Sequence, residues 1–372
     1  MQTLLSIAII ITLLTSVFII IKFGNLKLKG PNPVPIVTFI AILFTSGLDV
    51  GLIMFPLTEF AIYNENTEYQ FTNPLAIEFG FWGFLVWGFY FLTTFYFCAI
   101  EPKLKLFEIP LIKLINTLII VSTCAFTGYL FFSYLPDYIN NISEFNRYSV
   151  LGIVILLAVL SSTKLHYIKL LSVCSTLLFL VLLSSFWFNS NIDTKEAIET
   201  TSLLVGYFEN LHRFISPITN YHAFYLFWWF AWSIMIGQFV ARFVNGVKTW
   251  QLLVALLILP SIPIAVWFSI LYYYHTNAII ISDLMSISMV IVGIIFVINS
   301  LDSLIRLYTE NYNLTLKKLG AKKYILINFS ILYGLVLMYQ MTPFKIEWVG
   351  LTVIGLYSLV YFLIIVKRKS LK

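Results

Sequence analysis

The chain has 372 residues, of which 60% are hydrophobic and only 11% are charged. Soluble domains carry roughly 25% charged residues, so this composition excludes a soluble globular protein and indicates a polytopic membrane protein. Lysines at the cytosolic ends of membrane helices explain the net charge of +6, which does not require nucleic acid as a partner.

Apolar runs long enough to cross a bilayer recur along the whole chain, since a crossing needs about 20 apolar residues. The first run has no basic segment before it and no small-residue cleavage site, so it predicts a helix rather than a signal peptide. The runs predict an all-α protein with about eleven spans, at residues 2–21, 35–63, 76–99, 108–135, 148–163, 167–189, 221–243, 250–273, 280–305, 324–341 and 347–366.

Basic residues are divided unequally between alternate loops. All but four of the 23 Lys and Arg residues lie in one set of loops, and the exceptions are Arg147, Lys195, Arg213 and Lys345. The loops richer in Lys and Arg are expected to be cytoplasmic. This distribution predicts an external N-terminus and a cytoplasmic C-terminus in the cell (inner) membrane, and an odd number of crossings agrees with it.

The longest external loop, about 190–220, carries apolar residues at helical spacing and predicts an amphipathic helix on the outer surface. It divides the chain into an extra helix and loop (1–30), five spans (31–190), the surface helix (191–220), and five spans with a basic tail (221–372). Spans 35–63 and 221–243 run in opposite directions. The two sets of five therefore have opposite topology, which is typical of inverted-repeat secondary transporters.

The span 35–63 contains an interruption. It reads Thr45-Ser46-Gly47-Leu48-Asp49-Val50-Gly51, followed by Pro56 and Glu59. Glycines weaken a helix and proline removes a backbone donor, so free carbonyls here could bind a cation or a substrate group. A mid-span carboxylate such as Asp49 costs roughly 2.5–3.5 kcal/mol, so we expect it to face a cavity or a partner. The alternatives are a glycine-lined packing face and a protonated Asp49 bonded to another helix.

Aromatic residues are concentrated in two of the predicted spans. The run 224–232 holds Trp228, Trp229 and Trp232, and an earlier span holds Trp82, Trp87 and Tyr90. Residues three or four apart share a helix face, so Trp229 pairs with Trp232 and Trp87 with Tyr90. Such rings can be core packing or an interfacial belt. They can also form a cage whose ring faces attract a quaternary ammonium.

The span 280–305 ends in a polar cluster that includes Asn299, Ser300, Asp302 and Ser303. Helix capping or solvation explains part of it, and a cation site is the alternative, since hydroxyl and amide oxygens suit sodium. Metal-binding, phosphate-loop and nucleophile motifs are absent from the sequence, so neither an enzyme nor a bound cofactor is expected.

Four of these stretches resemble motifs of the betaine/choline/carnitine transporter family, and they occur in the family's order. The family's tryptophan motif is matched at Trp228, Trp229, Trp232, Gly237, Phe239, Ala241, Arg242 and Gly246. The family's earlier aromatic helix has the spacing of Trp82, Trp87 and Tyr90, and its glycine-rich run is matched at Gly47, Gly51, Leu52 and Glu59. Residues 296–303 resemble the family's FxTSADS-like run. The resemblance covers nearly the whole chain from about Lys27.

The resemblance implies a five-plus-five inverted-repeat (LeuT-like) fold and a trimethylammonium substrate in an aromatic box. Trp87, Tyr90 and Trp229 would form the box, with Trp228 and Trp82 beside it and Trp232 near the substrate's path. Members are commonly homotrimers.

The chain departs from the family at several points. By comparison with the family pattern we expect this chain to lack the family's first transmembrane helix and its long tails, so osmotic activation is not expected. Asn299 replaces one hydroxyl residue of the family's sodium site, so that only Ser300 keeps a hydroxyl there. Asp49 replaces a glycine of the glycine-rich run, and proton-coupled choline carriers of the family have an aspartate two positions later in the same run. These changes make H⁺ as well as Na⁺ a candidate coupling ion.

We therefore predict a secondary active transporter that imports a choline- or glycine betaine-type solute by alternating access. The alternative is a non-transporting membrane subunit or sensor within a larger complex. The short chain and the altered motifs motivate that alternative.

Overall fold

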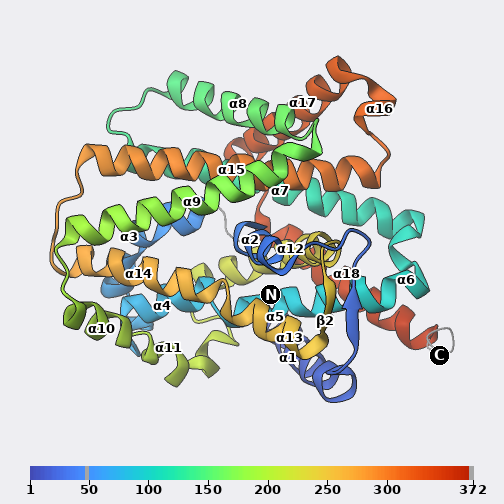
Figure 1. The fold of residues 1–372 in the computed structure, drawn as a ribbon, viewed down its shortest axis with the longest axis horizontal. Coiled ribbons are helices and arrows are strands. Elements are labelled where there is room, and N and C mark those ends of the chain that lie inside the picture. The colour runs from blue at the N-terminus through green and yellow to red at the C-terminus, as the bar shows by residue number, and fades with distance from the viewer. Residues whose placement is uncertain (47–49, 368–372) are drawn as a thin grey trace.

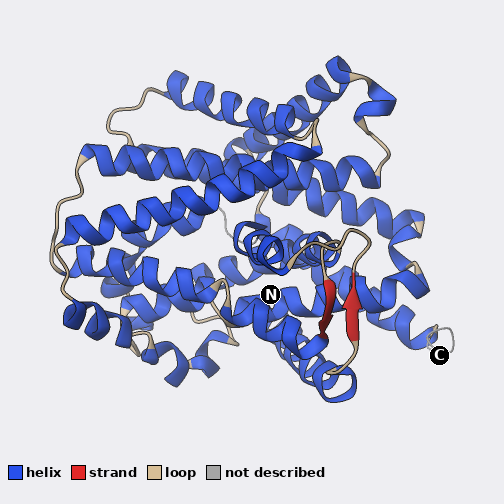
Figure 2. Ribbon diagram, viewed as in Figure 1, coloured by secondary structure: helices blue, strands red, loops and turns tan. Residues whose placement is uncertain are grey.

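The computed structural model describes residues 1–46 and 50–367, which are almost wholly helical (Figures 1 and 2). Ten helices or helix pairs in this part of the chain are long and apolar enough to cross a membrane. They correspond to ten of the predicted spans. The remaining predicted span, 35–63, is present as two helices on either side of residues 47–49. The prediction of an all-α polytopic membrane protein is therefore confirmed.

The first half of the chain begins with a helix outside the repeats and continues with five spans, of which the first two are built from more than one helix. Its elements are α1 (Gln2–Phe23), β1 (Lys27–Lys29), α2 (Ile36–Ser46), α3 (Val50–Glu65), η1 (Thr67–Tyr69), α4 (Pro74–Trp82), α5 (Leu85–Phe95), η2 (Tyr96–Ile100), α6 (Glu101–Leu104), η3 (Leu106–Glu108), α7 (Pro110–Tyr138), α8 (Glu144–Ser161) and α9 (Leu165–Ser190).

The second half begins with short helices and then has five more spans. Its elements are α10 (Thr194–Ser202), α11 (Val205–Glu209), η4 (Leu211–Phe214), α12 (Asn220–Ala241), β2 (Asn245–Lys248), α13 (Thr249–Ile258), α14 (Ser261–Thr276), α15 (Asp283–Asn311), α16 (Leu316–Leu319), α17 (Ala321–Met341) and α18 (Ile346–Val366). Strands β1 and β2 pair antiparallel and connect the two halves of the chain, to the right of centre in Figure 2.

Polar caps explain where several spans begin. The side chains of Asn73, Ser143, Thr219 and Ser282 each accept a hydrogen bond from a backbone N–H in the first turn of α4, α8, α12 and α15. Such caps satisfy donors that the helix itself leaves free, and each contributes about 1 kcal/mol.

Helices at matching places in the two halves make matching contacts. The third span of each half, α7 and α15, pack on each other. Helix α7 packs on α17 and α18 of the second half, while α15 packs on α8 and α9 of the first. Within each half the first span packs on the fifth, as α2 does on α9 and α12 does on α18. This exchange of contacts is the packing of a five-plus-five inverted repeat.

Pro56 lies inside α3 and shapes its surroundings. A proline has no N–H, so the carbonyl of Leu52, four residues earlier, has no partner within the helix. The indole N–H of Trp267 on α14 donates to that carbonyl at 2.9 Å. The carbonyl freed by Pro56 therefore holds α14 against α3, rather than binding an ion or substrate.

The segment 190–220 differs from its prediction, because α10, α11 and η4 replace a single amphipathic helix. The side-chain amide of Asn73 donates to the carbonyl of Leu203 at 2.9 Å, and the N–H of Gly206 donates to the same carbonyl at 3.1 Å in a tighter i to i+3 turn. Close packing of Gly206 against Thr72 and Asn73 then fixes α11 on α4. Tyr207 and Phe214, both on the predicted apolar face, are fully buried.

Candidate substrate site

The second span is broken at Gly83 and Phe84, between α4 and α5. Phe84 has a φ of 43°, in the left-handed region that non-glycine residues seldom adopt. Its N–H donates to Ser261 Oγ at 2.9 Å, and the N–H of Leu85 lies 3.3 Å from the hydroxyl of Tyr207, which accepts it. Ser261 begins α14, so the break in the first half meets the corresponding break between α13 and α14 in the second.

This break orients two of the predicted box residues. In a continuous helix the carbonyls of Phe81 and Trp82 would accept from N–H groups four residues later. The indole N–H of Trp229 instead donates to the Phe81 carbonyl at 2.6 Å, and the indole N–H of Trp87 donates to the Trp82 carbonyl at 3.2 Å. The local backbone of the first half therefore sets the direction of an indole from the second half.

Five of the six predicted aromatic residues form one buried cluster. Trp228 and Trp229 stack at 4.8 Å between ring centroids, and Trp82 packs edge-on against them at 5.4 and 5.1 Å. Tyr90 contacts Trp87 at 5.1 Å and Trp229 at 6.4 Å, both edge to face. These are preferred aromatic geometries. Because the rings cover one another, a cation can reach a ring face only after they separate.

Trp232, the sixth residue, lies apart from this cluster. It is 2% exposed, and in the described part of the chain it makes no ring contact with the other five. Its indole N–H also has no partner there.

Two acidic side chains lie beside the aromatic cluster, on α3 and α4. Glu78 accepts from the Tyr63 hydroxyl at 2.6 Å, and Glu59 accepts from the Tyr134 hydroxyl at 2.9 Å. Both are buried, and the second oxygen of each carboxyl has no hydrogen-bond partner among the described residues. The hydroxyl of Tyr225 is likewise buried and unpaired there.

Neither Glu59 nor Glu78 forms an ion pair with Lys or Arg within residues 1–46 and 50–367. Buried acidic groups are normally paired or neutral. Glu78 lies one helical turn before Trp82 on α4. The aromatic cluster therefore has an acidic neighbour without a basic counterpart among the described residues.

The predicted ion-coupling residues are only partly described. Gly47, Leu48 and Asp49 lie outside the described residues, and Gly51 is buried near the start of α3. Both flanking helices, α2 and α3, pack against α15. The described helices on either side of residues 47–49 therefore lie next to the helix that carries the polar cluster.

On α15 the two predicted ion ligands are buried. Ser172 of α9 donates to Asn299 Oδ1 at 3.5 Å, and the hydroxyl of Ser300 has no partner in the described part of the chain. Ser303 donates to the Asn299 carbonyl. Asn299 and Ser300 therefore retain side-chain oxygens that could contribute to a cation site.

Asp302 has a different role from the predicted cation ligand. Its carboxylate pairs with Arg306 at 2.7 Å and accepts from Ser161 Oγ at 2.7 Å. Arg306 also donates to the carbonyls of Ser161 and Lys164 at 2.8 and 2.7 Å. The pair therefore holds the turn between α8 and α9 against α15.

Comparison with known proteins finds one matching family model and several transporters of similar sequence. The family model described as betaine/carnitine/choline family transporter matches residues 98–274, which include the tryptophan run of α12. A glycine betaine/proline/choline/ectoine transporter of Vibrio parahaemolyticus is 24% identical over 303 residues, or 66% of this chain and 52% of the relative. Residues 98–274 of this chain are therefore similar to the betaine/carnitine/choline family transporters.

A second transporter and one solved structure are also similar to this chain. The glycine betaine transporter OpuD of Bacillus subtilis is 25% identical over 294 residues, covering 66% of this chain and 57% of OpuD. The chain thus aligns with little more than half the length of these two transporters. A Na⁺-coupled sialic acid symporter is 15% identical, with a TM-score of 0.40 over 99% of this chain and 82% of the symporter.

The sequence analysis did not predict two features of this site, the role of Glu78 and the carbonyl that receives the Trp229 indole. Glu78 does carry a signal, because it is an acidic residue inside a predicted span and such residues are often functional. Its pairing with Tyr63 on another helix has no signal in the sequence. The bond between the Trp229 indole N–H and the Phe81 carbonyl also has no signal in the sequence. That carbonyl is free to accept it only because the helix breaks two residues later.

Proposed function

We propose that this protein is a secondary active transporter that imports a quaternary-ammonium solute. The observation that carries the proposal is the buried aromatic cluster whose indoles are oriented by the break in the second span, with acidic residues beside it. A trimethylammonium group has no hydrogen-bond donors, so ring faces are its natural partners. Relatives whose names include glycine betaine and choline transporters support the same substrate class.

In this proposal Trp87, Tyr90 and Trp229 surround the ammonium group, Trp82 and Trp228 support them, and Trp232 lies along the path. The rings now pack edge to face, so the substrate must separate them on entry. The break at Gly83 and Phe84 provides a place where α4 and α5 can change angle. Alternating access then consists of movements of the two interlocked halves around the site.

The acidic neighbours make choline-type cations the leading substrate. Glu78 and Glu59 attract a positive group and disfavour the carboxylate of a zwitterion such as betaine. No basic side chain of the described residues offsets that repulsion by pairing with either acid.

We extend the proposal to coupling by an ion gradient. Asn299 and Ser300 offer oxygens suited to Na⁺, while Asp49 can accept and release H⁺. Imposed pH and Na⁺ gradients distinguish the two ions, since only the coupling ion drives accumulation.

The proposed setting is the cell (inner) membrane, with the N-terminus outside, the C-terminus inside and the protein assembled as a homotrimer. The unequal distribution of Lys and Arg supports the orientation. Crosslinking in intact membranes tests the trimer.

Uptake by proteoliposomes tests the function. We expect labelled choline to accumulate when a coupling gradient is imposed, and Trp229→Leu to reduce that accumulation strongly. Binding of choline without accumulation under either gradient would favour the alternative, a sensor or subunit of a larger complex. Absence of both binding and uptake of choline and betaine would overturn the proposed substrate class.

A further inference from the structure

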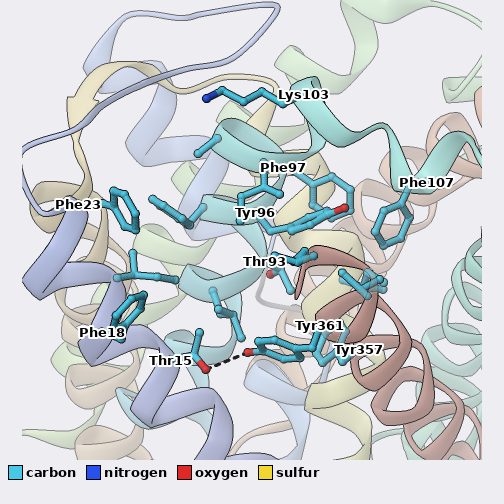
Figure 3. Close-up of a pocket in the computed structure, with 18 of the residues that line it drawn as sticks. Thr15, Phe18, Phe23, Thr93, Tyr96, Phe97, Lys103, Phe107, Tyr357 and Tyr361 are labelled. Carbon is cyan, nitrogen blue, oxygen red and sulfur yellow. Dashed lines mark hydrogen bonds between the residues drawn. The ribbon is translucent and has the colours of Figure 1, made fainter. Parts of the chain in front are cut away.

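A cavity of about 660 Å³ lies away from the aromatic cluster, between α1, α5, α12 and α18 (Figure 3). Its volume is in the range of small-molecule sites in proteins, roughly 300–1,000 Å³. Its lining is almost entirely aliphatic and aromatic, and includes Phe18, Phe23, Leu92, Phe95, Ile234 and Val360. The cavity therefore suits a hydrocarbon chain and not a polar solute.

The cavity has the depth of one leaflet of the bilayer. Its lining residues on α1 run from Leu14 to Phe23, which is the half nearer the end predicted to be cytoplasmic. From Thr15 to Phe23 the helix rises about 12 Å at 1.5 Å per residue. Half of the hydrocarbon core is about 15 Å thick. The lining residues of α18 also come from its C-terminal half, the half predicted to be nearer the cytoplasm. Both helices therefore place the cavity at the depth of the inner leaflet.

The two ends of the cavity differ chemically. At the mid-membrane end the hydroxyl of Tyr361 donates to Thr15 Oγ1 at 3.0 Å and joins α18 to α1. At the other end Lys103 lines the cavity beyond Tyr96 and Phe97, with its ammonium group at the rim (Figure 3). The apolar lining suits the hydrocarbon tail of a lipid, and the ammonium group of Lys103 suits an anionic headgroup. The hydroxyls of Tyr361 and Thr15 at the opposite end are bonded to each other.

We propose that this cavity binds an acyl chain of an anionic phospholipid from the inner leaflet, with the lipid phosphate at Lys103. Basic residues next to the cytoplasmic leaflet attract anionic headgroups, and the depth of the chamber matches one acyl chain. The occupant is a membrane lipid because the lining residues lie at hydrocarbon depth, where a soluble anion would not enter.

The cavity also adjoins α5, the helix that carries two residues of the proposed substrate site, Trp87 and Tyr90. Its wall includes η2, a π-helical turn that continues α5 directly, and α5 carries Trp87 and Tyr90. Thr93 lines the cavity and donates to the carbonyl of Ser233 on α12 at 2.7 Å. A bound lipid would therefore contact the junction of α5 and α12. This effect on transport rests on the proposed function, whereas lipid binding does not.

Native mass spectrometry of the protein released from nanodiscs tests the site. The nanodiscs contain equal amounts of phosphatidylglycerol and phosphatidylcholine. Lys103→Gln removes the cation, with Lys105→Gln, two residues away and outside the lining, as the matched control. Ala99→Trp fills the cavity, with Leu177→Trp on the exposed face of α9 as the control for added bulk.

We expect the parent protein to retain one phospholipid, with about a fivefold preference for the anionic lipid from a single lysine near the leaflet. Lys103→Gln should lose the preference, and Ala99→Trp should lose the lipid, while both controls behave like the parent. Equal lipid retention by the parent and Ala99→Trp would overturn the site, as would equal retention of both lipids by the parent. A protein dimer disrupted by Ala99→Trp would assign the cavity to a second copy instead. Val360→Phe provides a second filling variant if Ala99→Trp does not fold.

Discussion

The indole N–H of Trp229 on α12 donates to the carbonyl oxygen of Phe81 on α4 at 2.6 Å. This bond joins the first span of the second half to the broken span of the first half. It places the ring of Trp229 against Trp82 and Tyr90. The orientation of one box residue therefore depends on a backbone group that only the helix break makes available.

Trp229→Leu should weaken choline binding roughly thirtyfold, because a desolvated cation–π contact contributes about 2 kcal/mol or more. Trp229→Phe keeps a ring face but loses the bond to Phe81, so its loss should be smaller. The measurement is equilibrium binding to purified protein, with Trp348→Leu at an exposed position of α18 as the control. Parent-like affinity in Trp229→Leu would remove Trp229 from the substrate site.

Glu78→Gln should weaken choline binding roughly tenfold, the effect of an electrostatic contact of about 1.4 kcal/mol, and should weaken betaine binding less. Gln keeps the shape of the side chain and can still accept the hydroxyl of Tyr63. The matched control is Glu108→Gln, whose carboxylate is exposed and pairs with Lys113. If choline and betaine change equally, Glu78 does not distinguish them.

Gly237→Ala should destabilise the packing of α5 on α12. A Cβ at Gly237 would lie 2.3 Å from Thr93 Oγ1 and 2.8 Å from the Thr93 carbonyl carbon, so the helices would have to move apart. Overpacking of this kind costs typically 1–3 kcal/mol. Thermal unfolding in detergent measures the loss, and Gly334→Ala is the control because open space surrounds that position. Equal melting temperatures for the two variants would contradict the close approach.

Asp302→Asn should cost about 3–5 kcal/mol of stability, because it leaves Arg306 buried without its carboxylate. Replacing both residues, as Asp302→Asn with Arg306→Met, should recover part of the loss. The exposed pair of Lys195 and Glu199 serves as the control, since removing it should change stability by less than about 0.5 kcal/mol. A double variant less stable than Asp302→Asn alone would argue against the pair as the cause.

Single cysteines test the orientation in the membrane. In a variant with Cys98, Cys124 and Cys174 replaced by alanine, Lys195→Cys should react with an impermeant thiol reagent in intact cells. Lys317→Cys should react only after the cells are opened. Both positions are exposed, so accessibility within the protein does not bias the result. The reverse labelling pattern would invert the predicted topology.

The amino-acid sequence by itself determined the spans, because crossing a bilayer requires about 20 apolar residues and the chain shows each run directly. The sequence also marked five rings that cluster, namely Trp82, Trp87, Tyr90, Trp228 and Trp229, whereas Trp232 lies apart from them. These features are local, so they are readable without knowing which helices are neighbours.

Only the tertiary structure decided which groups those residues meet. Glu59 and Glu78 become neighbours of the aromatic cluster because α3 and α4 pack together. The carbonyl freed by Pro56 receives the Trp267 indole from α14, and the carboxylate of Asp302 binds Arg306 instead of an ion. Hydropathy is set by each segment alone, whereas a buried polar group takes whichever partner the packing of distant helices brings to it.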